Sequence, residues 1–184
     1  CLLETKSAAV APVMYINGHN SKLKAWKLPT KTTNMLDAII PLSALVGGFT
    51  KYHDSYYIES NPIVDVLPGS LIFFDPGVFC QIGGFDEDTF LYCEEDLIFA
   101  KLKKSGFCCR LCGEATYDHR HNVSIGKKFA SIFKRYTLLL KSKKIYNKKV
   151  LKTSIFYDVI YSSVFLVNVI LMVLVLNAKR LIKN

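Results

Sequence analysis

Residues 83–97, GGFDEDTFLYCEEDL, interleave carboxylates with aromatic and apolar side chains of the kind that proteins usually bury. The carboxylates are Asp86, Glu87, Asp88, Glu94, Glu95 and Asp96. Two interpretations fit this pattern. In the first, residues 86–88 cap a helix that begins near Thr89, and residues 94–96 form its solvated face. In the second, the carboxylates lie in a pocket beside a hydrophobic wall.

The segments before this stretch carry strand and turn signals. Residues 8–16 read as a strand that ends in an Asn17-Gly18 turn, and a short helix is expected near 34–46. Residues 63–74 read as two strand pieces around Pro68-Gly69. The sequence DPGVFCQIG, which follows them, predicts a turn into a single helical turn.

The segments after residues 83–97 carry a helix signal followed by a strand signal. Residues 89–104 have helical spacing and end in lysines, which suit the C-terminal end of a helix dipole. Gly106 is expected to cap this helix, and residues 107–112 read as a strand. Strands that alternate with helical segments predict an α/β fold.

The charge distribution divides the chain. Residues 1–100 contain 6 Lys and Arg against 12 Asp and Glu, whereas residues 101–184 contain 18 against 3. A hydrophobic content of 51% fits a folded chain rather than a disordered one. The basic half is expected to face something anionic, either nucleic acid or membrane headgroups.

The C-terminal region predicts membrane association. Residues 125–152 are rich in lysine with apolar residues on the other side, which is typical of an interfacial amphipathic helix. Residues 159–178 are uncharged and mostly apolar, long enough at about 1.5 Å per residue to cross a core of about 30 Å. The alternatives are a hairpin at the membrane surface and a helix buried in an oligomer.

The six cysteines do not form the spacing of a disulfide framework, so reduced thiols are expected. Cys109 and Cys112 form a C-x-x-C pair, but no second pair stands at the spacing of a zinc ribbon. The chain opens with Cys1 rather than methionine and has no signal peptide, and we expect it to be part of a longer protein.

Three linked pieces of sequence carry a family resemblance: VDVLPGSLIFF, GGFDEDTFLYCEEDLIFAKLKKSGF and EATYDHRHNVS, in this order. Together they resemble the acceptor half of glycosyltransferase family 2, inverting enzymes of GT-A fold that build bacterial surface polysaccharides. The resemblance implies an incomplete GT-A-like domain over 1–124, with a mixed sheet and flanking helices. A basic amphipathic segment at 125–152 and an apolar membrane-associated or transmembrane helix at 155–184 follow it.

The chemistry that the resemblance implies is transfer of a sugar from a nucleotide-diphosphate donor to an acceptor hydroxyl, with inversion. A general base must take the hydroxyl proton. The family's acidic pair matches Glu94 and Glu95, with Glu95 as the base and Glu94 as its neighbour. Since many members have Asp at the second position, the choice among Glu94, Glu95 and Asp96 stays open. Desolvation near Phe85 and like charges would raise the proton affinity of such a base.

The resemblance also implies roles for nearby residues. Gly84, Phe85 and Asp86 match the loop that lines the acceptor pocket, where the glycines permit a tight turn. Gly69 matches a position of close backbone approach to donor or acceptor, although a plain turn glycine fits equally.

A divalent ion is implied as well. His119, with His121 as the alternative, matches a histidine that completes the coordination of Mg²⁺ or Mn²⁺ on the diphosphate. The main ligands of that ion belong to a nucleotide-binding half with a D-x-D cluster. No such cluster precedes GGFDE, so the chain is expected to be a fragment that lacks this half.

The expected partners are a nucleotide-sugar donor, a glycan or lipid-linked acceptor, and the cytoplasmic face of a bacterial inner membrane. A second copy of the chain is a further candidate partner. The alternative function is a non-catalytic, membrane-anchored binding module of the same fold. Nucleic acid is not expected, because a phosphate-binding stripe over 127–152 would not need the uncharged tail behind it.

Overall fold

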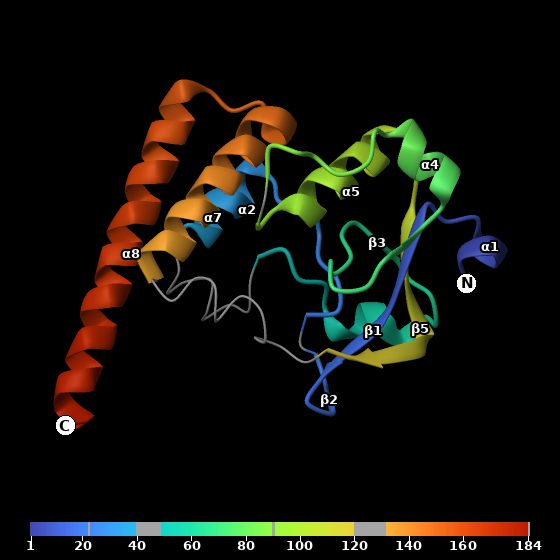
Figure 1. Cartoon of the computed structure of the whole chain (residues 1–184), viewed down its shortest axis with the longest axis horizontal. Coiled ribbons are helices and arrows are strands. Elements are labelled where there is room, and N and C mark those ends of the chain that lie inside the picture. The colour runs from blue at the N-terminus through green and yellow to red at the C-terminus, as the bar shows by residue number, and fades with distance from the viewer. Residues whose placement is uncertain (22, 40–48, 90, 120–131, 184) are drawn as a thin grey trace.

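A computed structural model describes residues 1–21, 23–39, 49–89, 91–119 and 132–183. It has the expected mixed α/β architecture, in which helices flank a mixed sheet and a long apolar helix ends the chain (Figure 1).

β1 is the centre of the sheet. This strand (Ala9–Ile16) pairs in parallel with β5 (Cys109–Asp118) on one edge. On its other edge it pairs antiparallel with β2 (His19–Asn20) and with β4 (Phe73–Phe74). β3 (Ile63–Val64) lies antiparallel to β5 and ends the sheet. The strands expected at 8–16 and on both sides of Pro68-Gly69 are therefore confirmed.

A bulge interrupts the β1–β5 ladder. The register moves from Pro12 opposite Cys112 to Val13 opposite Thr116. Because Pro12 has no N–H to donate, the ladder is weakest at this point, and β5 leaves it here. The backbone N–H of Gly113 instead donates to the carbonyl of Ser60 at 2.7 Å. β5 is consequently longer than the expected strand, because the polar residues beyond Cys112 rejoin β1.

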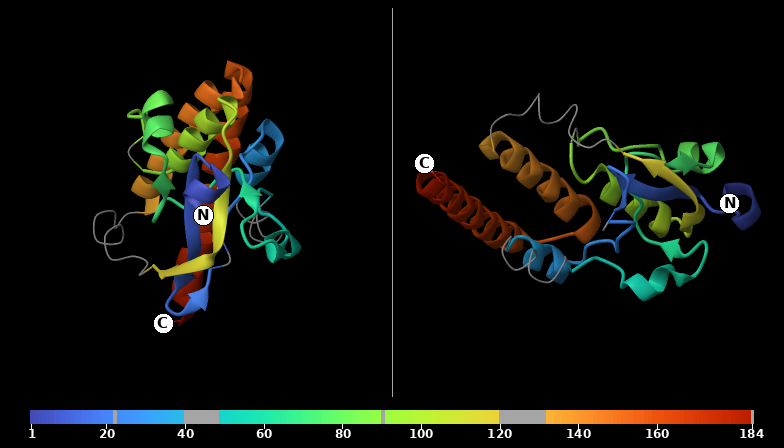
Figure 2. Two further views of the ribbon diagram at one scale, coloured as in Figure 1. Left: turned by 90° about the vertical axis from the view of Figure 1, so that its right-hand side faces the viewer. Right: turned by 90° about the horizontal axis from the view of Figure 1, so that it is seen from below.

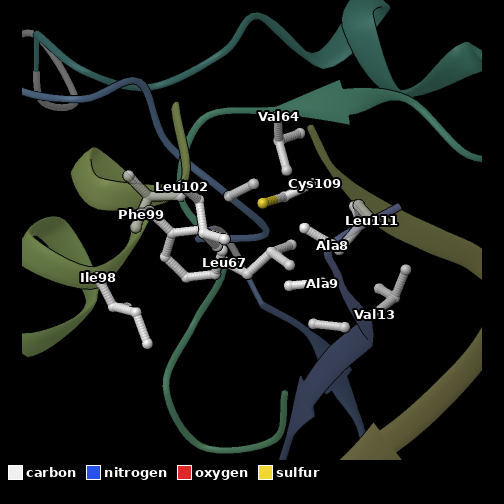
Figure 3. Packing of buried hydrophobic residues seen from close by; sticks show 13 residues of the cluster. Ala8, Ala9, Val13, Val64, Leu67, Ile98, Phe99, Leu102, Cys109 and Leu111 are labelled. Atoms are coloured by element: carbon white, nitrogen blue, oxygen red, sulfur yellow. The ribbon is translucent and has the colours of Figure 1, made fainter. Parts of the chain in front are cut away.

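Helix α5 (Glu94–Lys104) covers one face of the sheet and supplies its main core residues. Figure 3 shows Ile98, Phe99 and Leu102 of this helix packed with Leu67 and with residues of β1 and β5. The helix ends as expected at Gly106, whose φ is +80°. The N–H groups of Gly106 and Phe107 donate to the carbonyls of Lys103 and Leu102, which is a Schellman motif.

The start of α5 differs from the expectation. Tyr92 and Cys93 have φ of +71° and +62°, so the backbone turns left-handed twice immediately before Glu94. These angles are incompatible with a right-handed helix that runs on from Thr89. The interpretation in which residues 86–88 cap this helix is therefore wrong.

Short helices fill the connections. They are α1 (Leu2–Thr5), α2 (Lys31–Asp37), the 3-10 helix η1 (Asp54–Ile58) and α4 (Pro76–Gln81). α2 begins at a capping box of Thr30 and Thr33. It overlaps the start of the helix expected near 34–46; residues 40–48 lie outside the described part of the chain. α4 is the expected helical turn, capped by the Asp75 side chain.

The C-terminal helices form a second packed unit beside the sheet domain (Figure 2). α7 (Ile132–Tyr146) continues into a π-helical turn, η2 (Asn147–Leu151), and α8 (Ile155–Lys183) returns alongside α7. Over Ile155–Leu174 the helix α8 is long and apolar enough to cross a membrane, with a mean hydropathy of 1.9.

Asn147 holds the elbow between these helices and is fully buried. Its side-chain oxygen accepts from the Asn34 amide of α2 at 2.7 Å, and its amide donates to Asp158 of α8 at 3.1 Å. The Thr153 hydroxyl also donates to Asp158, at 2.9 Å. One asparagine side chain thus joins α2, η2 and α8.

Candidate functional site

Glu95 lies in the first turn of α5, and its carboxylate packs directly on Gly69. A Cβ at residue 69 would overlap the Oε1 atom of Glu95, so glycine is required here by close approach and not by its backbone angle. Burial raises the pKa of Glu95, and the like charges of Glu94 and Asp96 act in the same direction. Hydrogen bonds from the backbone N–H groups of Glu95 and Gly69 oppose the shift without cancelling it. The proton affinity of this carboxyl is therefore raised, which is the direction that favours a general base.

The backbone that delivers Glu95 is strained. Tyr92 and Cys93 are successive non-glycine residues in the left-handed region, each at a typical cost of about 1–3 kcal/mol. Cys93 is also the N-cap of α5 and makes no side-chain capping bond. Such strain persists only where the surrounding packing enforces it, and it is concentrated at functional sites.

A hollow of about 560 Å³ lies next to Gly69. Its lining combines a polar turn with aromatic walls: Gly69, Ser70, Leu71, Ile72, Phe74, Pro76, Phe79, Cys80 and Phe85. The rings of Phe74, Phe79 and Phe85 contact one another at centroid distances of 5.1, 5.9 and 5.7 Å. Two of the predicted acceptor-site residues, Gly69 and Phe85, therefore line one cavity, and Gly69 is also the residue on which the Glu95 carboxylate packs.

Gly84 shapes the wall of the same hollow. It has a φ of +60°, as expected for a tight turn, and a Cβ here would come within 3.2 Å of the Phe79 ring. The ammonium of Lys101 on α5 donates to the Gly84 carbonyl at 3.0 Å. α5 therefore positions both the candidate base and the glycine loop opposite it.

Asp96 is buried and its carboxylate is bound by other side chains. It is 6% exposed, and its Oδ1 atom accepts the indole N–H of Trp26 at 2.8 Å. Lys143 of α7 lies 4.0 Å from the other oxygen. Trp26 also exchanges two backbone hydrogen bonds with Val66, three residues before Gly69. Trp26 thus connects both sides of the Glu95–Gly69 contact.

Sequence reasoning did not find Trp26. It is the single tryptophan of the chain, but no periodicity or motif connects it with residues 94–96. Glu94 is partly exposed and stays the expected neighbour of Glu95.

Asp86 lies outside the hollow and is engaged by Lys149 of η2. Both of its carboxylate oxygens are 2.8 Å from the Lys149 ammonium, which also contacts Asp88 at 2.5 Å. Partial burial acts to raise the pKa of Asp86, but hydrogen bonds from Lys149 and the Asp88 N–H outweigh it, and the pKa is lowered. To bind an acceptor hydroxyl, Asp86 would have to share or release Lys149.

His119 follows the last residue of β5. Its backbone N–H donates to the Tyr15 carbonyl at 2.7 Å, and its ring lies 6.5 Å from that of Tyr117. The Tyr117 hydroxyl is hydrogen-bonded to Ser70, the residue after Gly69. A short path of contacts thus joins His119, through Tyr117, to Ser70 beside Gly69. His121, the alternative, lies outside the described residues.

The described residues do not form a complete metal site. Among them, no group of three His, Cys, Asp or Glu side chains is arranged to hold an ion. His119 is therefore at most one ligand of an ion whose other ligands come from elsewhere.

Comparison of the chain with protein-family models and with curated protein sequences finds no match.

Proposed function

We propose that this chain is the acceptor-side part of an inverting glycosyltransferase. It would transfer a sugar from a nucleotide-diphosphate donor to a hydroxyl of a glycan or lipid-linked acceptor, at the cytoplasmic face of a bacterial inner membrane. The observation that carries the proposal is the Glu95 carboxylate, half-buried against Gly69 at the edge of a hollow, with its pKa raised by burial.

Glu95 is the proposed general base. An acceptor hydroxyl within hydrogen-bond reach of its carboxylate gives up its proton to Glu95 while its oxygen attacks the anomeric carbon. The bond from that carbon to the diphosphate breaks on the opposite side, and the diphosphate leaves with the electron pair. Because attack and departure occur on opposite faces, the configuration inverts. Glu94 assists by raising the proton affinity of Glu95.

The hollow is the proposed acceptor site. Phe85, 47% exposed and in contact with two other phenyl rings, offers an apolar surface for the carbon-bound hydrogens of a sugar ring. Gly69 and Gly84 leave room for the Glu95 carboxylate and for the Phe79 ring, which a side chain at either position would displace. Asp86 is a second polar group near the loop, held by Lys149 until an acceptor competes for it.

The nucleotide would be bound by a half of the enzyme beyond these residues. A divalent ion such as Mg²⁺ or Mn²⁺ supplies positive charge to the departing diphosphate in enzymes of this kind. His119 is proposed as one ligand, and the D-x-D cluster of the other half would hold the rest. Transfer by the present chain alone is not expected.

The test uses the complete reading frame that contains this chain, expressed in membranes and supplied with a panel of radiolabelled nucleotide sugars. Wild type is expected to transfer label to a lipid-linked or glycan acceptor. Glu95→Gln is expected to lose about 100-fold or more of this activity while donor binding is retained, because the base is missing but the donor site is not.

Glu87→Gln is the matched control, since Glu87 is exposed and lies in the same acidic stretch. It is expected to leave transfer unchanged. Retention of transfer by Glu95→Gln would remove Glu95 from the role. Absence of transfer and of donor binding in the complete protein would favour the alternative, a non-catalytic binding module anchored to the membrane.

A further inference from the structure

α8 exposes a continuous apolar face. Tyr161, Phe165 and Val169 recur every four residues and are buried against α2 and α7. The opposite side carries the α8 ridge, which we define as the exposed residues Ile155, Phe156, Val159, Ile160, Leu166, Val167, Ile170, Leu171 and Leu174. These side chains follow the helical repeat and are mostly half or more exposed. A soluble monomer seldom leaves so long an apolar stripe in water.

The buried side of α8 is flanked by the protein along most of its length. Near its start, the Tyr157 hydroxyl donates to the Lys31 carbonyl of α2 at 2.6 Å. Further along, Tyr136 of α7 packs on Phe165 at 6.0 Å between centroids, and its hydroxyl reaches the sulfur of Met172 at 3.3 Å. These contacts attach α8 to the body from residue 157 to residue 172, and Figure 1 shows α8 running beside α7.

This packing is incompatible with a helix that crosses a bilayer. If residues 155–174 spanned the hydrocarbon core, the neighbouring Lys134, Lys141 and Lys144 of α7 would be carried into it at the same depth, and charged groups are strongly disfavoured there. The part of α8 beyond Met172 extends only about 16 Å to Lys183, against a core of about 30 Å. It also contains Lys179, Arg180 and Lys183.

The charges around the ridge match an anionic surface. Residues 132–184 contain 11 Lys and Arg and a single acidic residue, Asp158. Lys134, Lys141, Lys144 and Lys148 are exposed on one side of α7 and η2, at the spacing of one helix face. Within the described part of the chain, none of these four forms an ion pair. α7 packs on the buried side of α8, so these lysines stand about one helix spacing, about 8–10 Å, behind α8, where an anionic surface still attracts them over a Debye length of about 10 Å.

We propose that α8 lies along the surface of an anionic membrane, with the α8 ridge inserted at the boundary between headgroups and acyl chains and the α7 lysines behind it, attracted by the charge of the headgroups. The partner is the lipid surface itself. The proposal does not depend on sugar transfer, since it rests on packing and charge alone.

Vesicle flotation tests the partner with the full chain. Vesicles of phosphatidylcholine and phosphatidylglycerol in equal parts are expected to bind wild type, and pure phosphatidylcholine vesicles to bind it more weakly. Leu166→Glu with Ile170→Glu is expected to lower the bound fraction about tenfold or more, because two ridge residues become charged. Ile58→Glu, at an exposed apolar residue on η1 away from the ridge, is the control and is expected to bind normally.

Circular dichroism and melting curves verify that the variants fold. If Leu166→Glu with Ile170→Glu does not fold, Leu166→Gln with Ile170→Gln replaces it. Undiminished vesicle binding by folded ridge variants would overturn the proposal. So would a concentration-dependent dimer that the same variants abolish in the absence of vesicle binding, because the ridge would then be an interface between copies.

Depth-dependent quenching tests the orientation. Tryptophan is introduced separately at Phe156, Leu166 and Leu174, with the Trp26 signal of wild type subtracted, and quenched by lipids brominated near the headgroup or near the bilayer centre. A helix along the surface predicts stronger quenching by the shallow bromine at all three positions. Deep quenching of Leu166→Trp with shallow quenching at both ends would show a crossing helix and overturn the proposal.

Discussion

The two acidic clusters of residues 83–97 have opposite environments, although only five residues separate them. Asp86 and Asp88 share one lysine at the surface, and the pKa of Asp86 is lowered. Glu95 is largely buried beside two other carboxylates, and its pKa is raised. The first cluster is thus a tether between the glycine loop and η2, and the second is a candidate for proton transfer. Burial and partners brought by the fold, more than the local density of acids, decide in which direction the pKa of each carboxyl moves.

The largest expected effect comes from removal of the group that anchors the second cluster. Asp96→Ala leaves the indole N–H of Trp26 and the Lys143 ammonium without their acceptor, so we expect a loss of about 3 kcal/mol in the free energy of unfolding. Urea unfolding measures it. Glu87→Ala, in the exposed loop, is expected to stay within about 0.5 kcal/mol of wild type. Equal losses for the two variants would mean that Asp96 is not an anchor.

A smaller structural change, with a large effect on function, is expected at Gly69. Gly69→Ala puts a methyl group where the Glu95 carboxylate lies and forces it to move. If Glu95 is the base, a displacement of about 1 Å costs about 100-fold in transfer by the complete enzyme. Gly77→Ala, a glycine-to-alanine change on α4 outside the lining of the hollow, is the control. Normal transfer by Gly69→Ala would separate the Glu95–Gly69 contact from catalysis.

The pH dependence of stability should distinguish the clusters by sign. The raised pKa of Glu95 contributes stability that is fully present below the unfolded value of 4.5 and is lost as the pH rises through the folded pKa. The free energy of unfolding of wild type, relative to that of Glu95→Gln, is therefore expected to fall across that window. Urea unfolding from acid to neutral pH measures it. Transfer by the complete enzyme should rise over the same window as the base ionises. A difference that does not vary with pH would contradict the raised pKa.

The smallest expected effect is at the first cluster. The lowered pKa of Asp86 contributes stability that is fully present above the unfolded value of 3.8. This stability is lost as the pH falls through the folded pKa. Because Lys149 is solvent-exposed, Lys149→Gln is expected to lower the melting temperature only slightly, and less so in concentrated salt. Lys148→Gln, which removes a neighbouring charge without an ion pair, is the control. An equal effect of both variants would mean that the Lys149 tether contributes nothing.

The fold was predictable where local chemistry and tertiary structure agree. The apolar run at 8–16 with its Asn17-Gly18 turn, the Gly106 cap and the lysines before it predicted β1 and the end of α5 correctly. The start of α5 was not predictable, because left-handed Tyr92 and Cys93 have no sequence signal and are held by contacts from distant segments. For the same reason β5 was predicted too short, since GEATYD is polar and becomes a strand only beside β1.

The candidate site was predictable in part. The resemblance selected Gly69, Phe85 and Glu95; the structure places Gly69 and Phe85 in the lining of one hollow and packs Glu95 on Gly69. It did not indicate that Lys149 engages Asp86 or that Trp26 supports Asp96, because both contacts join residues more than 60 positions apart. Pairings at that separation depend on the completed fold and leave no periodic trace in the chain.

If the chain is the proposed transferase, the buried amide of Asn147 would affect which acceptors it can use. It joins the three helices around the elbow, so the angle between α8 and the sheet domain is set by a few hydrogen bonds in place of a flexible linker. With α8 resting on lipid as proposed, the height of Glu95 above the bilayer surface would be fixed. Acceptors would then be selected by reach as well as by chemistry, since only a hydroxyl that stands at that elevation meets the carboxylate.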